Sequence, residues 1–161
     1  MAEEQGDRGD RDKKVFVDRM QLTLHTGNVT DAETNGEVYL VTAAREFNVK
    51  RAGIDDRRKG GRDVYRLGGD DSNIQNKERN NPAGIPLWVL NSSVIGLRFL
   101  PQPNTPPAPP DTWNLAMATL LVTGDDGLTD EYVLDDSLQR LWLGFHTTLT
   151  AGLRFNQTFE P

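Results

Sequence analysis

The chain has 161 residues, a formal net charge of −6, 36% hydrophobic residues and no cysteine. This length predicts one domain with a core of its own, and the lack of cysteine excludes disulfides, zinc-thiolate sites and a cysteine nucleophile. The acidic balance argues against general nucleic-acid binding, which needs a basic face.

The first segment, residues 1–14, reads MAEEQGDRGDRDKK and mixes charges of both signs. Such a composition predicts a flexible N-terminal arm ahead of a single domain over residues 15–161. No apolar stretch follows the arm, so the pattern contains neither a signal peptide nor a transmembrane helix. We therefore expect a cytoplasmic protein, or one exported without a signal peptide as part of an assembly.

Short apolar or alternating stretches, separated by turn residues, fill the rest of the chain. Alternation with a period of two is typical of half-buried strands. The pattern predicts an all-β, antiparallel sandwich or barrel with strands within residues 15–27, 37–49, 63–67, 87–101, 112–124, 130–136, 138–144 and 148–155.

The first stretch changes phase partway along. Met20, Leu22 and Leu24 share one face, whereas Val15 and Val17 belong to an earlier phase. An extra residue in one strand produces such a change, so we expect a β-bulge here.

Two long polar segments separate the strands in the middle of the chain. Residues 75–86 are broken by prolines and glycine and predict an irregular connection. Residues 101–110 hold six of the nine prolines and predict a stiff, extended loop.

Several of these stretches together resemble the PLAT/LH2 domain, a β-sandwich found in lipoxygenases, lipases and polycystins. LTLHTGNVTDAETNGEVYL is similar to the opening strand, turn and second strand of that family. VIGLRFLP followed by DTWNLAMATLLVTG resembles its central strand and the Trp-containing strand after it, and RLWLG resembles its late strand. The resemblance implies an antiparallel eight-stranded β-sandwich with long charged and Pro-rich loops. It also implies a non-catalytic targeting module that contacts a membrane surface or a partner protein, sometimes with calcium, and it places Trp113 in the core.

The most unusual charge pattern lies between Lys50 and Arg66. Seven basic and three acidic residues give this segment +4, so the rest of the chain carries −10. A basic island on an acidic domain is a candidate docking feature, and its candidate contact residues are Lys50, Arg51, Arg57, Arg58, Lys59 and Arg62. The interleaved aspartates offset part of the attraction, so self-pairing or a plain solvated loop is the alternative.

An acidic protein face is the favoured partner of this loop, and an anionic membrane is the other candidate. Each near-surface cation contributes about 1 kcal/mol at such a membrane. Self-association is one form of the protein contact, because the basic loop of one copy complements the acidic C-terminal half of the next. A head-to-tail contact of this kind builds a ring or a filament.

The acidic turns raise the question of calcium, which needs several converging oxygen ligands. Asp70, Asp71 and Asn73 are the tentative ligands, and the alternative is ordinary turn chemistry beside glycines. No other cofactor is expected. With His25 and His146 as the only histidines and no nucleophile motif, the sequence predicts no enzyme.

The tryptophans divide into two groups. Trp88 lies near a Pro-rich break and is a candidate interface residue, whereas Trp113 and Trp142 lie in apolar patterns and are expected in the core. The favoured function is a non-catalytic interaction module that uses the basic loop. The alternative is a structural subunit of a larger particle, such as a phage-like or injection-type ring, tube or filament, clasped by residues 1–14 and 101–110.

Overall fold

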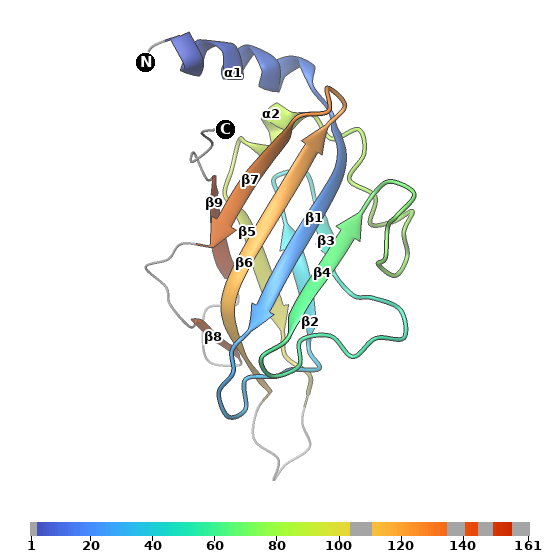
Figure 1. Cartoon of the computed structure of the whole chain (residues 1–161), viewed down its shortest axis with the longest axis vertical. Helices are drawn as coiled ribbons and strands as arrows, with labels where there is room; N and C mark the ends of the chain where they lie inside the picture. The colour runs from blue at the N-terminus through green and yellow to red at the C-terminus, as the bar shows by residue number, and fades with distance from the viewer. Residues whose placement is uncertain (1–2, 104–110, 135–140, 145–149, 156–161) are drawn as a thin grey trace.

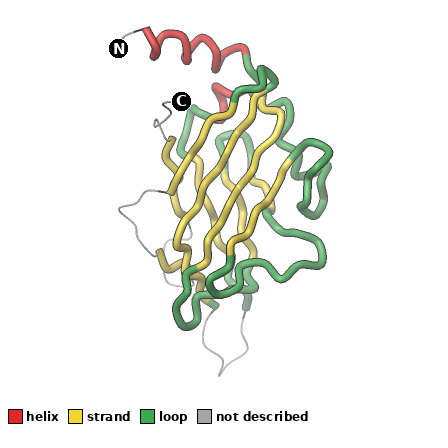
Figure 2. Tube along the Cα trace, viewed as in Figure 1, coloured by secondary structure: helices red, strands yellow, loops and turns green. Residues whose placement is uncertain are grey.

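The computed structural model describes residues 3–103, 111–134, 141–144 and 150–155. Within them, strands dominate and two helices lie at one end (Figures 1 and 2). The helices are α1 (Glu3–Lys14) and α2 (Leu87–Leu90). The strands are β1 (Val17–Thr26), β2 (Glu37–Val41), β3 (Glu46–Asn48), β4 (Arg62–Leu67), β5 (Ile95–Leu100), β6 (Thr112–Gly124), β7 (Thr129–Leu134), β8 (Leu141–Gly144) and β9 (Thr150–Phe155).

The strands form an antiparallel β-sandwich, as the sequence predicts. Eight of them follow one hydrogen-bonded path in the order β3-β2-β5-β9-β7-β6-β1-β4, and β8 pairs with the start of β6. Figure 1 shows the layer β7-β6-β1-β4 in front of the layer that holds β2, β3 and β5. The end that carries α1 and α2 is called the upper end below, and the opposite end the lower end.

The core lies between the two layers and follows the period-two pattern. Met20, Leu22 and Leu24 of β1 are buried in it. The pairing of β1 with β6 shifts register between Val17 and Arg19, so the predicted bulge is confirmed. The apolar side chains on both sides of the bulge, Val17 before it and Met20 after it, therefore point into the core.

Trp113 is fully buried, as predicted. Its ring packs at a tilt against Phe99, with 5.9 Å between ring centroids. Its Nε1 donates a hydrogen bond to Thr26 Oγ1 at 3.0 Å, so the indole leaves no unpaired donor in the core.

Two predicted strands are wrong in extent. The stretch 37–49 is a hairpin of β2 and β3, because Thr42 turns the chain by exchanging hydrogen bonds with the backbone of Arg45. The stretch 87–101 begins with the single helical turn of α2, which follows Pro86. A proline fixes φ and suits a position at the start of a helix.

Trp142 is also placed differently from the prediction. It lies in β8, a four-residue strand, and is 40% exposed. Its partner in the ladder is Asn114 at the start of β6. The apolar pattern of this short strand does not reveal which of its residues faces the core.

Residues 3–14 form a helix rather than the predicted flexible arm. The last turn of α1 contacts the β6–β7 hairpin and α2 at the upper end. Neither helix in the described part of the chain is long and apolar enough to cross a membrane. The predicted Pro-rich loop falls largely on residues 104–110, which lie outside the described residues, as does His146.

Candidate docking surface

The basic loop, defined here as residues 50–62, joins β3 to β4 at the lower end (Figure 1). Hydrogen bonds fix it to the end of β1: Thr26 N donates to the carbonyl of Gly61, and Gly60 N donates to the carbonyl of Gly27. Gly53 and Gly60 have φ of 66° and 68°, the left-handed region that favours glycine. The loop therefore has a defined conformation.

Arg57 does not belong to the exposed surface. It is only 3% exposed, and its φ of 61° is unusual for a residue with a side chain. Its guanidinium donates to the carbonyl of Gly36 at 2.8 Å and to the hydroxyl of Tyr65 at 3.1 Å. The prediction of Arg57 as a surface contact is wrong on this point, because the side chain joins the loop to the core.

Arg51 is also engaged inside the domain. Its Nε donates to Asp56 Oδ1 at 2.6 Å, and its Nη2 pairs with Asp63. Burial alone would lower the pKa of Arg51. The two carboxylates together raise its pKa by more than burial lowers it, so the net shift is upward. Asp63 also accepts a hydrogen bond from the backbone N–H of Arg57 at 2.8 Å. Arg51, Asp56 and Asp63 thus form one ionic network under the loop, and Arg57 is joined to it through its backbone N–H.

The outer side of the loop carries the remaining charges. Arg58 pairs with Asp55 at 2.7 Å, and both side chains are exposed. Lys50, Lys59 and Arg62 are exposed, and no ion pair joins them to a carboxylate of the described residues. Every aspartate of the segment therefore has an internal arginine partner, and the unbalanced charge left at the surface is positive.

Ile54 adds an apolar side chain to this surface, and it is 53% exposed. It follows Gly53, around which a Cβ would meet no atom within 4 Å, so this turn projects from the body. Our sequence reasoning missed Ile54. A single apolar residue after a glycine in an otherwise charged loop was the available signal.

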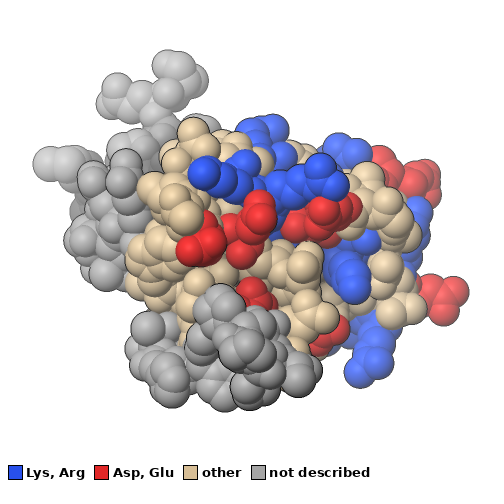
Figure 3. Space-filling model, turned by 90° about the horizontal axis from the view of Figure 1, so that it is seen from below, with Lys and Arg blue, Asp and Glu red and all other residues tan. Residues whose placement is uncertain are grey.

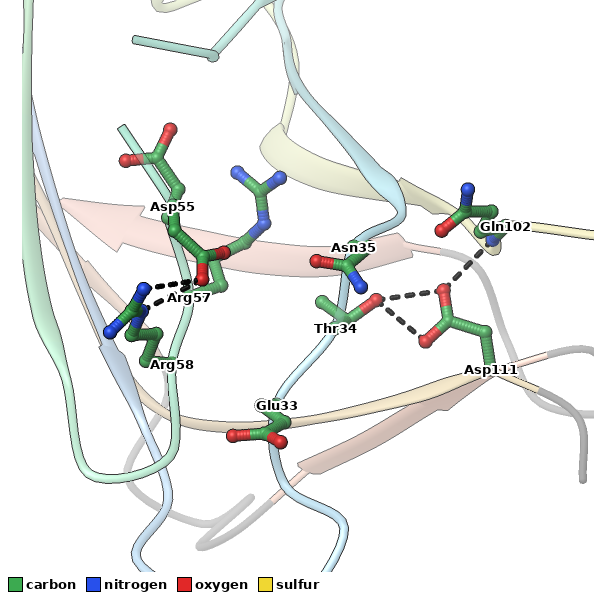
Figure 4. Close-up of a pocket in the computed structure, with 9 residues that line it drawn as sticks. Glu33, Thr34, Asn35, Asp55, Arg57, Arg58, Gln102 and Asp111 are labelled. Carbon is green, nitrogen blue, oxygen red and sulfur yellow. Dashed lines mark hydrogen bonds and ion pairs between the residues drawn. The ribbon is translucent and has the colours of Figure 1, made fainter. Parts of the chain in front are cut away.

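Viewed from below, the lower end shows basic side chains beside acidic ones (Figure 3). A polar hollow of about 430 Å³ lies next to the loop. Asp55 and Arg58 form one wall, and Thr34, Asn35 and Asp111 lie across from them (Figure 4). Asp111 already accepts hydrogen bonds from Thr34 Oγ1 and from the backbone N–H of Gln102, each at 2.8 Å. The hollow borders the docking surface.

The tentative calcium ligands lie elsewhere, in the turn after β4. Asp70 and Asp71 are exposed, and Asp71 pairs with Arg66 at 3.4 Å. Asn73 Oδ1 accepts from the backbone N–H of Arg66 at 2.8 Å, and its Nδ2 donates to the carbonyl of Val64 at 2.9 Å. Among the described residues, no group of three or more His, Asp or Glu side chains is arranged to hold a metal ion.

Asn73 has a structural role that explains its position. β4 is the last strand of the path, so its outer edge has no strand partner. Asn73 satisfies backbone groups of that edge and blocks further pairing, the usual protection of an edge strand. Asn80 does the same at the other end of the path, where its Oδ1 accepts from the backbone N–H of Asn48 in β3.

Trp88 lies far from the basic loop, at the upper end in α2 (Figure 1). It is 53% exposed, as expected for an interface candidate. The structure therefore does not combine Trp88 and the loop cations into one surface. His25 lies in β1. Its neighbours across the sheet are Arg62 of β4 and Met117 of β6, and neither is a carboxylate.

No protein-family model matches the chain, and no curated protein matches its sequence. Solved structures do match its fold. The alpha toxin of Clostridium absonum aligns with a TM-score of 0.50 and 17% identity over 92% of this chain and 34% of that chain. The Clostridium perfringens alpha-toxin from an avian strain aligns with a TM-score of 0.52 and 16% identity, over 88% of this chain and 32% of that chain. The fold is PLAT/LH2-like.

At these identities the likeness concerns the fold alone. A coral 8R-lipoxygenase aligns over 85% of this chain and 17% of that chain with a TM-score of 0.45 and 12% identity. This chain spans about a third of the length of the two toxins.

Proposed function

We propose that this chain is a non-catalytic interaction module that docks onto an acidic protein face through the outer side of its basic loop. The contact residues are Lys50, Arg58, Lys59 and Arg62, with Ile54 as an apolar anchor at the projecting turn. One observation carries the proposal: the aspartates of the loop are neutralised by its own arginines, which leaves a positive surface on an acidic domain.

The geometry of the loop supports docking in a second way. The ionic network beneath it and the bonds to β1 hold the loop in one conformation. A preorganised surface loses little conformational entropy when a partner binds. An exposed aliphatic side chain among cations also supplies the apolar contact that charged pairs alone lack.

A binding experiment with a polyglutamate peptide tests the proposal. The test variant carries Lys50→Gln, Lys59→Gln and Arg62→Gln. The matched control carries Lys13→Gln, Lys77→Gln and Arg79→Gln, which removes the same charge at exposed positions that form no ion pair within the described residues. At about 0.5–1 kcal/mol for each contact, the test variant should bind about 10- to 100-fold more weakly than the wild type. The control should bind like the wild type.

Vesicles of phosphatidylserine and phosphatidylcholine distinguish the two partner classes. Binding to these vesicles without binding to polyglutamate assigns the loop to a membrane surface instead of a protein. If the wild type binds neither probe, or if both triple variants lose binding equally, the proposed docking role of the loop is refuted.

A further inference from the structure

The helix α1 is held to the upper end mainly by the ion pairs of Arg11 with Asp126 and Asp130, called the clip below. Arg11 Nε donates to Asp126 Oδ2 at 2.5 Å, and its Nη1 donates to Asp130 Oδ2 at 3.0 Å. Its Nη2 also approaches the carbonyl of Leu128 at 3.5 Å. These contacts raise the pKa of Arg11 and lower the pKa of Asp126. One further bond, from Asn91 Nδ2 to Asp12 Oδ2 at 2.8 Å, joins α1 to the end of α2.

The sequence of α1 gives it no apolar means of attachment. Its residues, EEQGDRGDRDKK, include no apolar side chain and two glycines. A helix that is polar on all faces is not anchored by hydrophobic burial. An isolated helix of this length is marginal, and each glycine weakens it further. The position of α1 therefore depends on its polar contacts.

The acceptor side of the clip is built independently of α1. Asp126 lies in the turn between β6 and β7, where its Oδ1 accepts from the backbone N–H of Leu128 at 3.1 Å and Gly127 has a φ of 79°. Gly124 lets the partners approach closely, because a Cβ there would lie 2.5 Å from Val15 Cγ1 and 2.6 Å from Asp126 Oδ1. The hairpin thus presents a preformed site for one guanidinium.

We propose that α1 is an exchangeable strap, and that Arg11 of one copy occupies the Asp126–Asp130 site of a second copy. The partner is a second copy because, among the described residues, the guanidinium that complements the charge of Asp126 and Asp130 is the chain's own Arg11. The joint for the exchange is the connection between Lys14 and Val15. An extended backbone at this connection breaks the hydrogen bond from Val15 N to the carbonyl of Arg11. The pairing of Val17 with Gly124 stays intact.

Reciprocal exchange of α1 closes a dimer by domain swapping, a route in which each contact of the single chain is remade between copies. The contacts are the same in both arrangements, so protein concentration decides between them against the effective concentration of the attached strap. This association uses the upper end and does not involve the basic loop at the lower end.

Cross-linking tests the exchange, because the native chain has no cysteine to interfere. Lys14→Cys and Leu128→Cys place thiols beside the clip at two exposed side chains. The two single variants, one of them with a size tag, are mixed at high concentration and treated with a short bismaleimide. The control mixture pairs Lys14→Cys with Lys77→Cys.

We expect a covalent heterodimer at a yield about tenfold above that of the control mixture, since exchange brings the two sites together. Adding Arg11→Gln to the Lys14→Cys variant, or raising the salt concentration, should remove this product. If the double variant cross-links internally while the mixture gives no more than the control, the strap stays on its own chain and the proposal is overturned. A heterodimer that persists with Arg11→Gln, or an absence of cross-links in both samples, overturns it as well.

Discussion

The basic loop and α1 are the two most highly charged segments described, and they are fixed in different ways. In the loop, Asp56, Arg57 and Asp63 are buried together and set a single conformation. In α1, the clip lies near the surface, and both Arg11 and Asp126 keep contact with solvent. A buried network leaves charges unpaired when it opens, whereas a surface clip exchanges its partner for water at little cost. The loop is therefore a rigid platform and α1 is releasable.

The largest expected effect comes from opening the buried network. Asp63→Ala breaks a largely buried ion pair, because it removes one of the two carboxylates that pair with Arg51. It also leaves the buried backbone N–H of Arg57 without its acceptor. We expect a loss of about 3–5 kcal/mol in the free energy of unfolding. Urea denaturation measures it. Asp55→Ala, which breaks only the exposed pair with Arg58, is the control and should change stability by less than about 0.5 kcal/mol. Equal effects of the two substitutions would show that the network is not buried as described.

The edge protection by Asn73 should have an intermediate effect. Asn73→Ala exposes two backbone groups of β4 that its amide now satisfies. The expected cost is about 1–3 kcal/mol, together with faster aggregation because the freed edge is able to pair with another strand. Denaturation and light scattering measure the two consequences. Lys77→Ala, an exposed change in the same connection, should alter neither quantity.

The sequence predicts the parts of this fold that repeat locally. The alternation in β1 and in residues 112–124 identifies the strands, the phase change in β1 identifies the bulge, and the antiparallel sandwich follows from both. The pattern in residues 37–49 continues through the turn at Thr42, so alternation alone does not divide it into two strands.

The candidate docking surface was predictable only as a charge island. The arginines of the loop look equivalent in sequence, yet Arg57 is buried because its acceptors come from residues 36, 49 and 65. These contacts arise from the tertiary structure, which local patterns do not contain. The same holds for α1, since its mixed charges predict a solvated arm until Asp126 and Asp130 are brought beside Arg11.

Opening the clip should have a smaller effect on stability than either change above. Arg11→Gln removes both ion pairs, and the expected cost is about 0.5–1 kcal/mol because the pair is partly exposed. Its main consequence should be local: the helical circular dichroism signal falls as α1 loses its attachment. Lys13→Gln, at an exposed position in the same turn, should preserve that signal. An unchanged spectrum in the Arg11 variant would show that the helix does not depend on the clip.

Acid should release α1 with a pH dependence set by Asp126. Because Arg11 lowers the pKa of Asp126 in the folded chain, the clip contributes its full stabilisation above the ordinary aspartate pKa and loses it as the pH falls through the lowered value. The protection factors of the α1 amides, which compare the observed exchange rate with the intrinsic rate at the same pH, should therefore be steady above a pH of about 5 and fall below about 4, while those of β1 stay constant. In Arg11→Gln the protection of α1 should be low at every pH, because the pairs of Arg11 with Asp126 and Asp130 are absent. A loss of protection that begins near neutral pH would assign the release to a group other than Asp126. A loss of protection in β1 at the same pH would mean that the whole domain opens rather than α1 alone.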